Sequence, residues 1–366
     1  MLFELTNEQR IYLGLTQVKD SWEKVELRDD IYLYFDNDRL VKRIIVTEDK
    51  YHEIELNDLT TEHRTMLLPR TSKGKEKKLN FTAAAALSGT GVYFAFAGNR
   101  VCIANFSTQT TFYDSRWENK EIEGFSGLKN WLDWWMKDTT ESDTNDIENF
   151  RTSVRQRCKY REGDFFVFKT GRRQFGFGRI LMDVSLVRKA IKEGKIKGKH
   201  YGLMNLMGKS LIIKIYKYND STMNVSIDKL RQCEAYYSQS IMDNVFLYGE
   251  YRIIGNQPIE PFELEFPISY GRSISARDRD TVYLQYGMIY KEAPLSEYSK
   301  YLYDPESAHD KNNPFRNESV GFSASSTIRT GDLRHPQNVD IKREIFEYFG
   351  LDADKGYFEN YTNVTI

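Results

Sequence analysis

The chain has 366 residues, of which 40% are hydrophobic and 29% are charged, so it can bury more than one core and does not have the composition of a disordered protein. Its 52 basic and 53 acidic residues nearly cancel, and its three widely spaced cysteines do not form the pattern of a disulfide framework. No apolar run approaches the ~20 residues of a membrane helix, and the first residues lack the features of a signal peptide, so we expect a cytoplasmic protein with no membrane partner.

The first half of the chain is predicted to be a short helix followed by a β-rich segment. Residues 6–15 fit a helix, and the aromatic and β-branched runs that follow predict strands at residues 31–35, 40–46, 51–56, 92–98 and 100–106. The DND sequence after the first of these strands is typical of a turn. Together these runs predict an antiparallel meander.

One helix is marked by its own periodicity at residues 127–138. Its apolar residues recur at i, i+3, i+4 and i+7, as expected for the core face of a helix: Leu128, Trp131, Leu132 and Trp135. The next stretch, residues 139–150, is polar and acidic and has no apolar periodicity. We therefore predict an α+β accessory domain over residues 1–138 and a polar linker over residues 139–150.

The second half opens with a predicted hairpin, GDFFVFKTGRRQFGFGRIL, at residues 163–181. Two strands flank the turn TGRR, which places Arg172 and Arg173 at an exposed tip. Gly176 and Gly178 would weaken an ordinary strand, so they suggest a bulge, a barrel corner or a closely approaching backbone.

The elements after the hairpin are a basic helix, two long strands and a closing helix. The basic helix has Ser185 as its expected cap and Gly194 as its stop, and strands are predicted at 211–218 and 281–290 before a helix at 340–350. We predict a β-rich α+β protein of two domains. The second, over residues 151–366, is expected to be a strongly bent antiparallel or barrel-like sheet with a few helices.

Charge is concentrated between Arg151 and Lys217, where 18 Lys and Arg residues face four acidic residues and the rest of the chain carries the compensating negative charge. Such asymmetry points to an acidic protein or a nucleic acid as partner. An equally weighted alternative is that the segment pairs with acidic parts of its own chain or forms a solvated face. The candidate partner-binding residues are Arg172, Arg173, Lys189, Lys192 and Lys195.

No motif in the sequence demands catalysis, a metal or a cofactor. The five histidines are scattered, at positions 52, 63, 200, 309 and 335, and none forms a metal-ligand spacing with another or with a cysteine pair. Neither a nucleophile elbow nor a P-loop is present. We therefore expect no enzyme, no metal and no cofactor, and a hydrolase stands third among the functions considered because it lacks a recognisable motif.

A nucleic-acid-binding protein is the runner-up, because basic residues interleaved with aromatic ones supply phosphate contacts and stacking platforms. Phe175 and Phe177 stand at i and i+2 and share a face of their strand with Arg179. They match no nucleic-acid signature, and two such phenylalanines more often belong to a core.

The hairpin resembles the immunity protein 26 family of bacterial polymorphic-toxin systems, over roughly residues 160–290. The resemblance is carried by REGDFFVF, QFGFGRIL, LIIKIYKY and the segment YGEYRIIGNQPIEPFE, with the following motif positions of unassigned role: Gly163, Asp164, Phe175, Phe177, Gly178 and Arg179. It implies a small cytoplasmic β-rich domain that binds and neutralises a cognate toxin without enzymatic activity. The first 138 residues have no counterpart in that family, and residues 184–200 look like an insertion.

Overall fold

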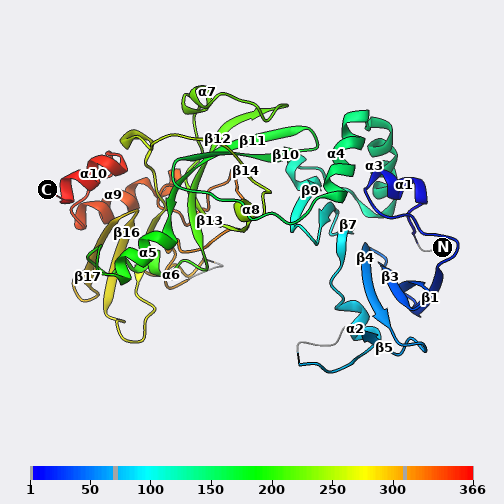
Figure 1. Cartoon of the computed structure of the whole chain (residues 1–366). Coiled ribbons are helices and arrows are strands. Elements are labelled where there is room, and N and C mark those ends of the chain that lie inside the picture. The colour runs from blue at the N-terminus through cyan, green and yellow to red at the C-terminus, as the bar shows by residue number, and fades with distance from the viewer. Residues whose placement is uncertain (1–2, 69–72, 308–310, 366) are drawn as a thin grey trace. The chain divides into compact units, whose positions relative to one another are not determined.

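The computed structural model of the protein describes residues 3–68, 73–307 and 311–365 (Figure 1). The chain divides into two compact units. Unit 1 contains residues 1–157, 169–174 and 248–250, and unit 2 contains residues 158–168, 175–247 and 251–366. The predicted α+β class is confirmed, because both units combine antiparallel strands with helices.

Unit 1 is built on an antiparallel meander. Its strands are β1 (Glu23–Arg28), β2 (Ile31–Asp36), β3 (Arg39–Val46), β4 (Lys50–Thr60), β5 (Met66–Leu68), β6 (Lys77–Lys78), β7 (Thr90–Ala97), β8 (Arg100–Asn105) and β9 (Thr110–Asp114). The main path of the sheet runs β1-β2-β3-β4-β7-β8-β9, and β5 pairs with β4 and β6. Its helices are α1 (Asn7–Tyr12), α2 (Phe81–Ala85), the 3-10 helix η1 (Ser115–Glu118), α3 (Gly124–Asp138) and α4 (Glu141–Thr152).

The periodicity of α3 correctly predicted its buried face. Leu128, Trp131, Leu132 and Trp135 are all buried, and they pack on apolar residues of β7 and β8. The Trp135 indole donates to the carbonyl of Tyr12 over 3.0 Å, which satisfies its buried N–H. Burial of this stripe therefore fixes α3 on one face of the sheet of unit 1.

The segment predicted to be a polar linker, residues 139–150, instead forms most of α4. Thr140 and Asp143 make a capping box, in which each side chain accepts from the backbone N–H of the other residue. Ile147 is buried in the core, and Phe150 packs against that core from the next turn. The capping box and the two apolar contacts thus stabilise α4, although this helix lacks the broad apolar stripe from which helices were predicted.

His52 on β4 is a half-buried imidazole that lies beside the guanidinium of Arg43. The guanidinium of Arg43, which can only donate, lies 3.3 Å from Nδ1 of His52. Burial first, and then the positive charges of Arg43 and Lys50, lower the pKa of His52 to about 4.

This depressed pKa predicts a stability loss in mild acid. As the pH falls below ~6.5, the unfolded chain protonates His52 while the folded chain does not, so the loss develops between about pH 6.5 and pH 4. Between about pH 7 and pH 5, we expect the free energy of unfolding of the wild-type protein to fall by roughly 2 kcal/mol because of His52. In His52→Gln this part of the pH dependence should be absent. Urea unfolding of both proteins at the two pH values measures it, and an identical pH dependence in the two would contradict the assignment.

Unit 2 contains two antiparallel sheets and several short helices. Its strands are β10 (Asp164–Gly171), β11 (Gln174–Asp183), β12 (Ser210–Asp220), β13 (Gln239–Met242), β14 (Arg252–Asn256), β15 (Ile268–Arg272), β16 (Thr281–Tyr286) and β17 (Ile289–Pro294). Its helices are α5 (Val184–Lys192), α6 (Tyr201–Asn205), α7 (Ile227–Arg231), α8 (Asn244–Leu247), η2 (Pro261–Glu263), η3 (Pro336–Asn338), α9 (Val339–Tyr348) and α10 (Tyr357–Thr365). The turn between β10 and β11, residues 169–174, belongs to unit 1.

The larger sheet of unit 2 is open and does not close into the barrel that the glycines had suggested. Its order among the described residues is β13-β12-β11-β10-β14, while β15, β16 and β17 form a separate sheet. A closed barrel would require the edge strands β13 and β14 to pair with each other. Instead, Gly321 pairs with β13, through backbone hydrogen bonds of 2.8 Å with Met242 and 2.9 Å with Ser240. A later segment of the chain therefore covers this edge.

Helices α9 and α10 lie close together in Figure 1 and pack with the smaller sheet around one hydrophobic core. The closing helix was predicted with Asp340 at its start, but its N-terminal flanking residue is Asn338. None of the helices within the described residues is long and apolar enough to cross a membrane.

Candidate functional site: the motif hairpin and the basic helix

Gly163 and Asp164 form a tight turn at the start of β10. Gly163 has a φ of +84°, and a Cβ there would meet the carbonyl oxygen of Gln257 at 2.4 Å, so only glycine fits without strain. The Asp164 carboxylate accepts from the backbone N–H of Arg161 and from the Asn256 amide, both over 2.8 Å. Asp164 therefore caps a turn at the start of the hairpin.

Arg179 on β11 is fully buried, and its partner is Glu263. Its guanidinium also donates to the carbonyls of Gln257 and Pro258 over 2.7 and 2.8 Å and lies 4.4 Å from the ring centroid of Phe165. Burial acts to raise the pKa of Glu263, but hydrogen bonds from the Glu260 backbone and from Arg179 outweigh it and lower that pKa. Arg179 thus ties the segment after β14 to the sheet.

The aromatic and glycine positions of the motif are also part of the core. Phe177 is buried and Phe175 packs against the same cluster, so neither is a free stacking platform for a base. A Cβ at Gly178 would lie 2.3 Å from the Phe166 ring and 2.5 Å from the Lys214 carbonyl oxygen. The second glycine therefore marks a close backbone approach, one of the alternatives drawn from the sequence.

The turn TGRR is only partly the exposed tip that we expected, because Gly171 and Arg172 are buried whereas Arg173 is exposed. Arg172 is only 8% exposed, its guanidinium lies 3.7 Å from the Trp135 ring centroid, and it donates to the Trp135 carbonyl and to Asp138 over 3.1 Å. Arg173 pairs with Asp138 and Asp143. These acidic partners lie 30 to 35 residues earlier in the chain, so the hairpin part of the basic segment is neutralised internally.

The two ends of the basic helix α5 are set by Asp183 and Gly194. Its N-cap is Asp183 rather than Ser185, because the Asp183 carboxylate accepts from the backbone N–H of Ser185 over 2.9 Å. The helix ends before Gly194, whose φ of +70° provides the left-handed residue of a typical C-terminus. Val184 is buried in the core, which leaves the opposite side of α5 at the surface.

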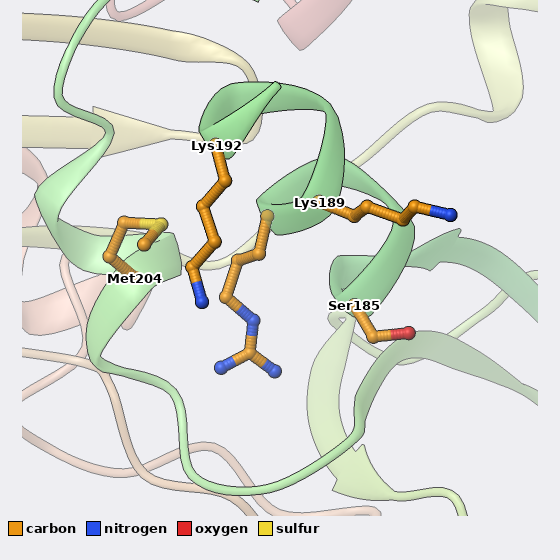
Figure 2. Close-up of a pocket in the computed structure, with 5 residues that line it drawn as sticks. Ser185, Lys189, Lys192 and Met204 are labelled. Atoms are coloured by element: carbon orange, nitrogen blue, oxygen red, sulfur yellow. The ribbon is translucent and has the colours of Figure 1, made fainter. Parts of the chain in front are cut away.

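One face of α5 carries a stripe of polar and basic side chains that lines an open pocket of about 340 Å³. Ser185, Arg188, Lys189 and Lys192 stand at i, i+3, i+4 and i+7, which places them on one face of the helix, and Met204 of α6 faces them. Figure 2 shows Lys192 reaching into the space beside Met204, whereas Lys189 and Ser185 point to the other side.

The charges around α5 are only partly compensated. Residues 184–199 contain six basic residues and one acidic residue, Glu193. Glu193 lies 3.8 Å from Lys189 and 2.7 Å from Lys195, and Lys199 pairs with Asp278 and Glu292. Lys192 is exposed and has no acidic partner among the residues that the structure describes. Free positive charge therefore remains on the surface of α5 and the residues after it, as well as on the exposed Arg157 and Lys159 before the hairpin.

Within residues 3–68, 73–307 and 311–365, no group of three or more His, Cys, Asp or Glu side chains could hold a metal ion. His309, one of the five scattered histidines, lies outside the described residues.

The sequence reasoning missed Arg188, Met204 and the role of Glu263. The polar stripe of α5 could have been predicted from the spacing of Ser185, Arg188, Lys189 and Lys192, whereas we considered only the ends of this helix and its lysines. Met204 and Glu263 carried no such signal, because only the folding of distant segments brings them to α5 and Arg179.

Comparison with known protein families gives a match to part of the chain. The family model described as immunity protein 26 matches residues 161–280, which include β10 to β15, α5 and the Gly163, Asp164, Gly178 and Arg179 motif. This confirms the resemblance over that segment of the chain. No curated protein and no solved structure gives a significant match.

Proposed function

We propose that the protein is a non-enzymatic immunity protein that acts in the cytoplasm and neutralises a cognate bacterial toxin by binding to it and blocking its active surface. The observation that carries this proposal is the match of the immunity protein 26 model to residues 161–280, since members of immunity families protect cells from toxins. In this reading the motif residues build the scaffold and the exposed helix α5 supplies the contact surface.

The free charge of α5 supports an acidic protein as partner. Lys189 and Lys195 each expose 72% of their side chains, and Lys192 adds an uncompensated charge between them in the sequence. Exposed charge of one sign speeds the association of a partner of opposite sign. Arg172 and Arg173 no longer contribute to this proposal, because they are ion-paired within the chain.

If the proposal is right, a neighbouring gene encodes the cognate toxin, and the test uses the domain that this gene encodes. We expect co-expression of the protein to protect cells from that domain, and the purified pair to associate at a rate that falls as salt rises. Changing Lys189 and Lys195 together to Glu should slow association about tenfold at low salt and change dissociation little, because exposed charges act mainly on encounter.

A matched control is Arg277→Glu with Arg279→Glu, which makes the same charge change on the loop before β16. Protection by the wild-type protein with no measurable binding would contradict blocking as the mechanism. Tight, salt-sensitive binding to random-sequence DNA or RNA at physiological ionic strength would instead favour the nucleic-acid function.

A further inference from the structure

Three cations line the pocket beside α5, and two of them, Arg188 and Lys192, differ in character. Arg188 is half-buried, and two of its N–H groups donate to the carbonyls of Leu206 and Gly208, which holds the side chain in place. A guanidinium has five N–H donors, so three remain beyond these two hydrogen bonds. Lys192 lies one turn further along the helix, is exposed and has no acidic partner among the described residues, so its ammonium is available to a bound anion.

Apolar side chains adjoin these cations. The thioether of Met204 lines the pocket opposite Lys192 (Figure 2). Met207 stands between the two residues whose carbonyls hold Arg188, and it is 56% exposed. Methionine side chains adapt to varied apolar partners. The pocket thus offers a guanidinium held by two carbonyls, an exposed ammonium and the thioether of Met204, and the exposed Met207 follows three residues later in the chain.

This combination suits a single carboxylate on an apolar peptide better than a nucleic-acid backbone. A duplex or single strand requires a row of cations, yet Glu193 partly neutralises Lys189 and Lys195 on the neighbouring surface. A side-chain carboxylate needs only the charges of Arg188 and Lys192, and a charge-assisted hydrogen bond in a partly buried pocket is stronger than one in open solvent.

We infer that the pocket lined by Arg188, Lys192 and Met204 is an anchor site for an aspartate or glutamate side chain that is flanked by an apolar residue. Resting on the proposed function, the inference assigns this acidic and apolar segment to the toxin. Arg188 positions the carboxylate, Lys192 closes over it, and the apolar neighbour packs on Met204 and Met207.

The experiment uses short peptides of alternating Leu and Glu, with alternating Leu and Gln as the uncharged probe. The methionine methyl groups of the full chain are isotopically labelled, and the signals of Met204 and Met207 are followed by NMR during titration. We expect the Leu-Glu peptide to shift both signals and to bind at least about tenfold more tightly than the Leu-Gln peptide. Lys192→Glu should remove this difference.

Lys195→Glu is the matched control, because it makes the same charge change on an exposed lysine outside the pocket. Lys195→Glu should retain at least half of the ratio between the affinities for the Leu-Glu and Leu-Gln peptides. Equal losses in the two variants, or equal binding of the two peptides, would overturn the anchor site. Arg188 is left intact because its substitution would also release the loop after α6.

The same two variants separate this inference from the proposed function. If the toxin domain binds and both variants weaken it equally, the anchor site is wrong and the proposed function stands. If the Leu-Glu peptide binds as expected but the toxin domain does not, the pocket is a carboxylate site and its assignment to the toxin is wrong.

Discussion

Replacing Arg179 with Met is expected to destabilise unit 2 by about 3–5 kcal/mol, because it leaves the buried carboxylate of Glu263 without its main cation. Two backbone carbonyls, those of Gln257 and Pro258, lose their donor in the same change. Urea unfolding followed by hydrogen exchange of peptides from β10, β11 and β12 would locate the loss in unit 2.

The control for this variant is Arg161→Met, since Arg161 is exposed and lies 3.8 Å from its acidic neighbour Asp164. It should change stability by less than about 0.5 kcal/mol. The double variant Arg179→Met with Glu263→Gln should recover about 1 kcal/mol or more relative to Arg179→Met alone. A loss below about 1 kcal/mol for Arg179→Met would show that the buried pair does not hold the motif segment.

Glu53→Gln is expected to have an effect of similar size in unit 1. Glu53 is fully buried and accepts from Arg10 over 3.0 Å, from Tyr51 over 2.5 Å and from Lys42, which is also fully buried. Burial acts to raise the pKa of Glu53, but the charges of Lys42 and Arg10 outweigh it and lower that pKa. Without the carboxylate, the buried Lys42 loses its counter-ion and Arg10 keeps only Glu4, 3.4 Å away, so we expect a loss of about 3–5 kcal/mol in the free energy of unfolding.

This variant also tests whether the two units are independent domains, as we propose. Hydrogen exchange should rise in β3 and β4, while toxin binding by the surface of α5 should persist. Glu26→Gln is the control, because Glu26 is exposed on β1 and should contribute within about 0.5 kcal/mol. Equal destabilisation of peptides from both units would show that the chain unfolds as one cooperative body.

Several features of this protein followed from the sequence because they depend on neighbours within a few residues. The apolar stripe of α3 and the stop of α5 at Gly194 were predicted correctly from helical spacing and from the backbone freedom of glycine. The motif of the hairpin was also recognised, because its residues stand close together in the sequence, although the backbone that Gly163 and Gly178 approach, at Gln257 and Lys214, comes from later segments.

The partners of the basic residues were decided only by the tertiary structure. Eighteen basic residues between Arg151 and Lys217 suggested one charged surface, yet Arg172 and Arg179 are buried against Asp138 and Glu263. Net charge along a sequence does not specify which residues meet in space, because an ion pair joins segments that are distant in the chain. The sequence by itself therefore determined the apolar face of α3, the end of α5 and the motif, whereas the fold decided which basic residues are paired within the chain and which, on α5, stay exposed.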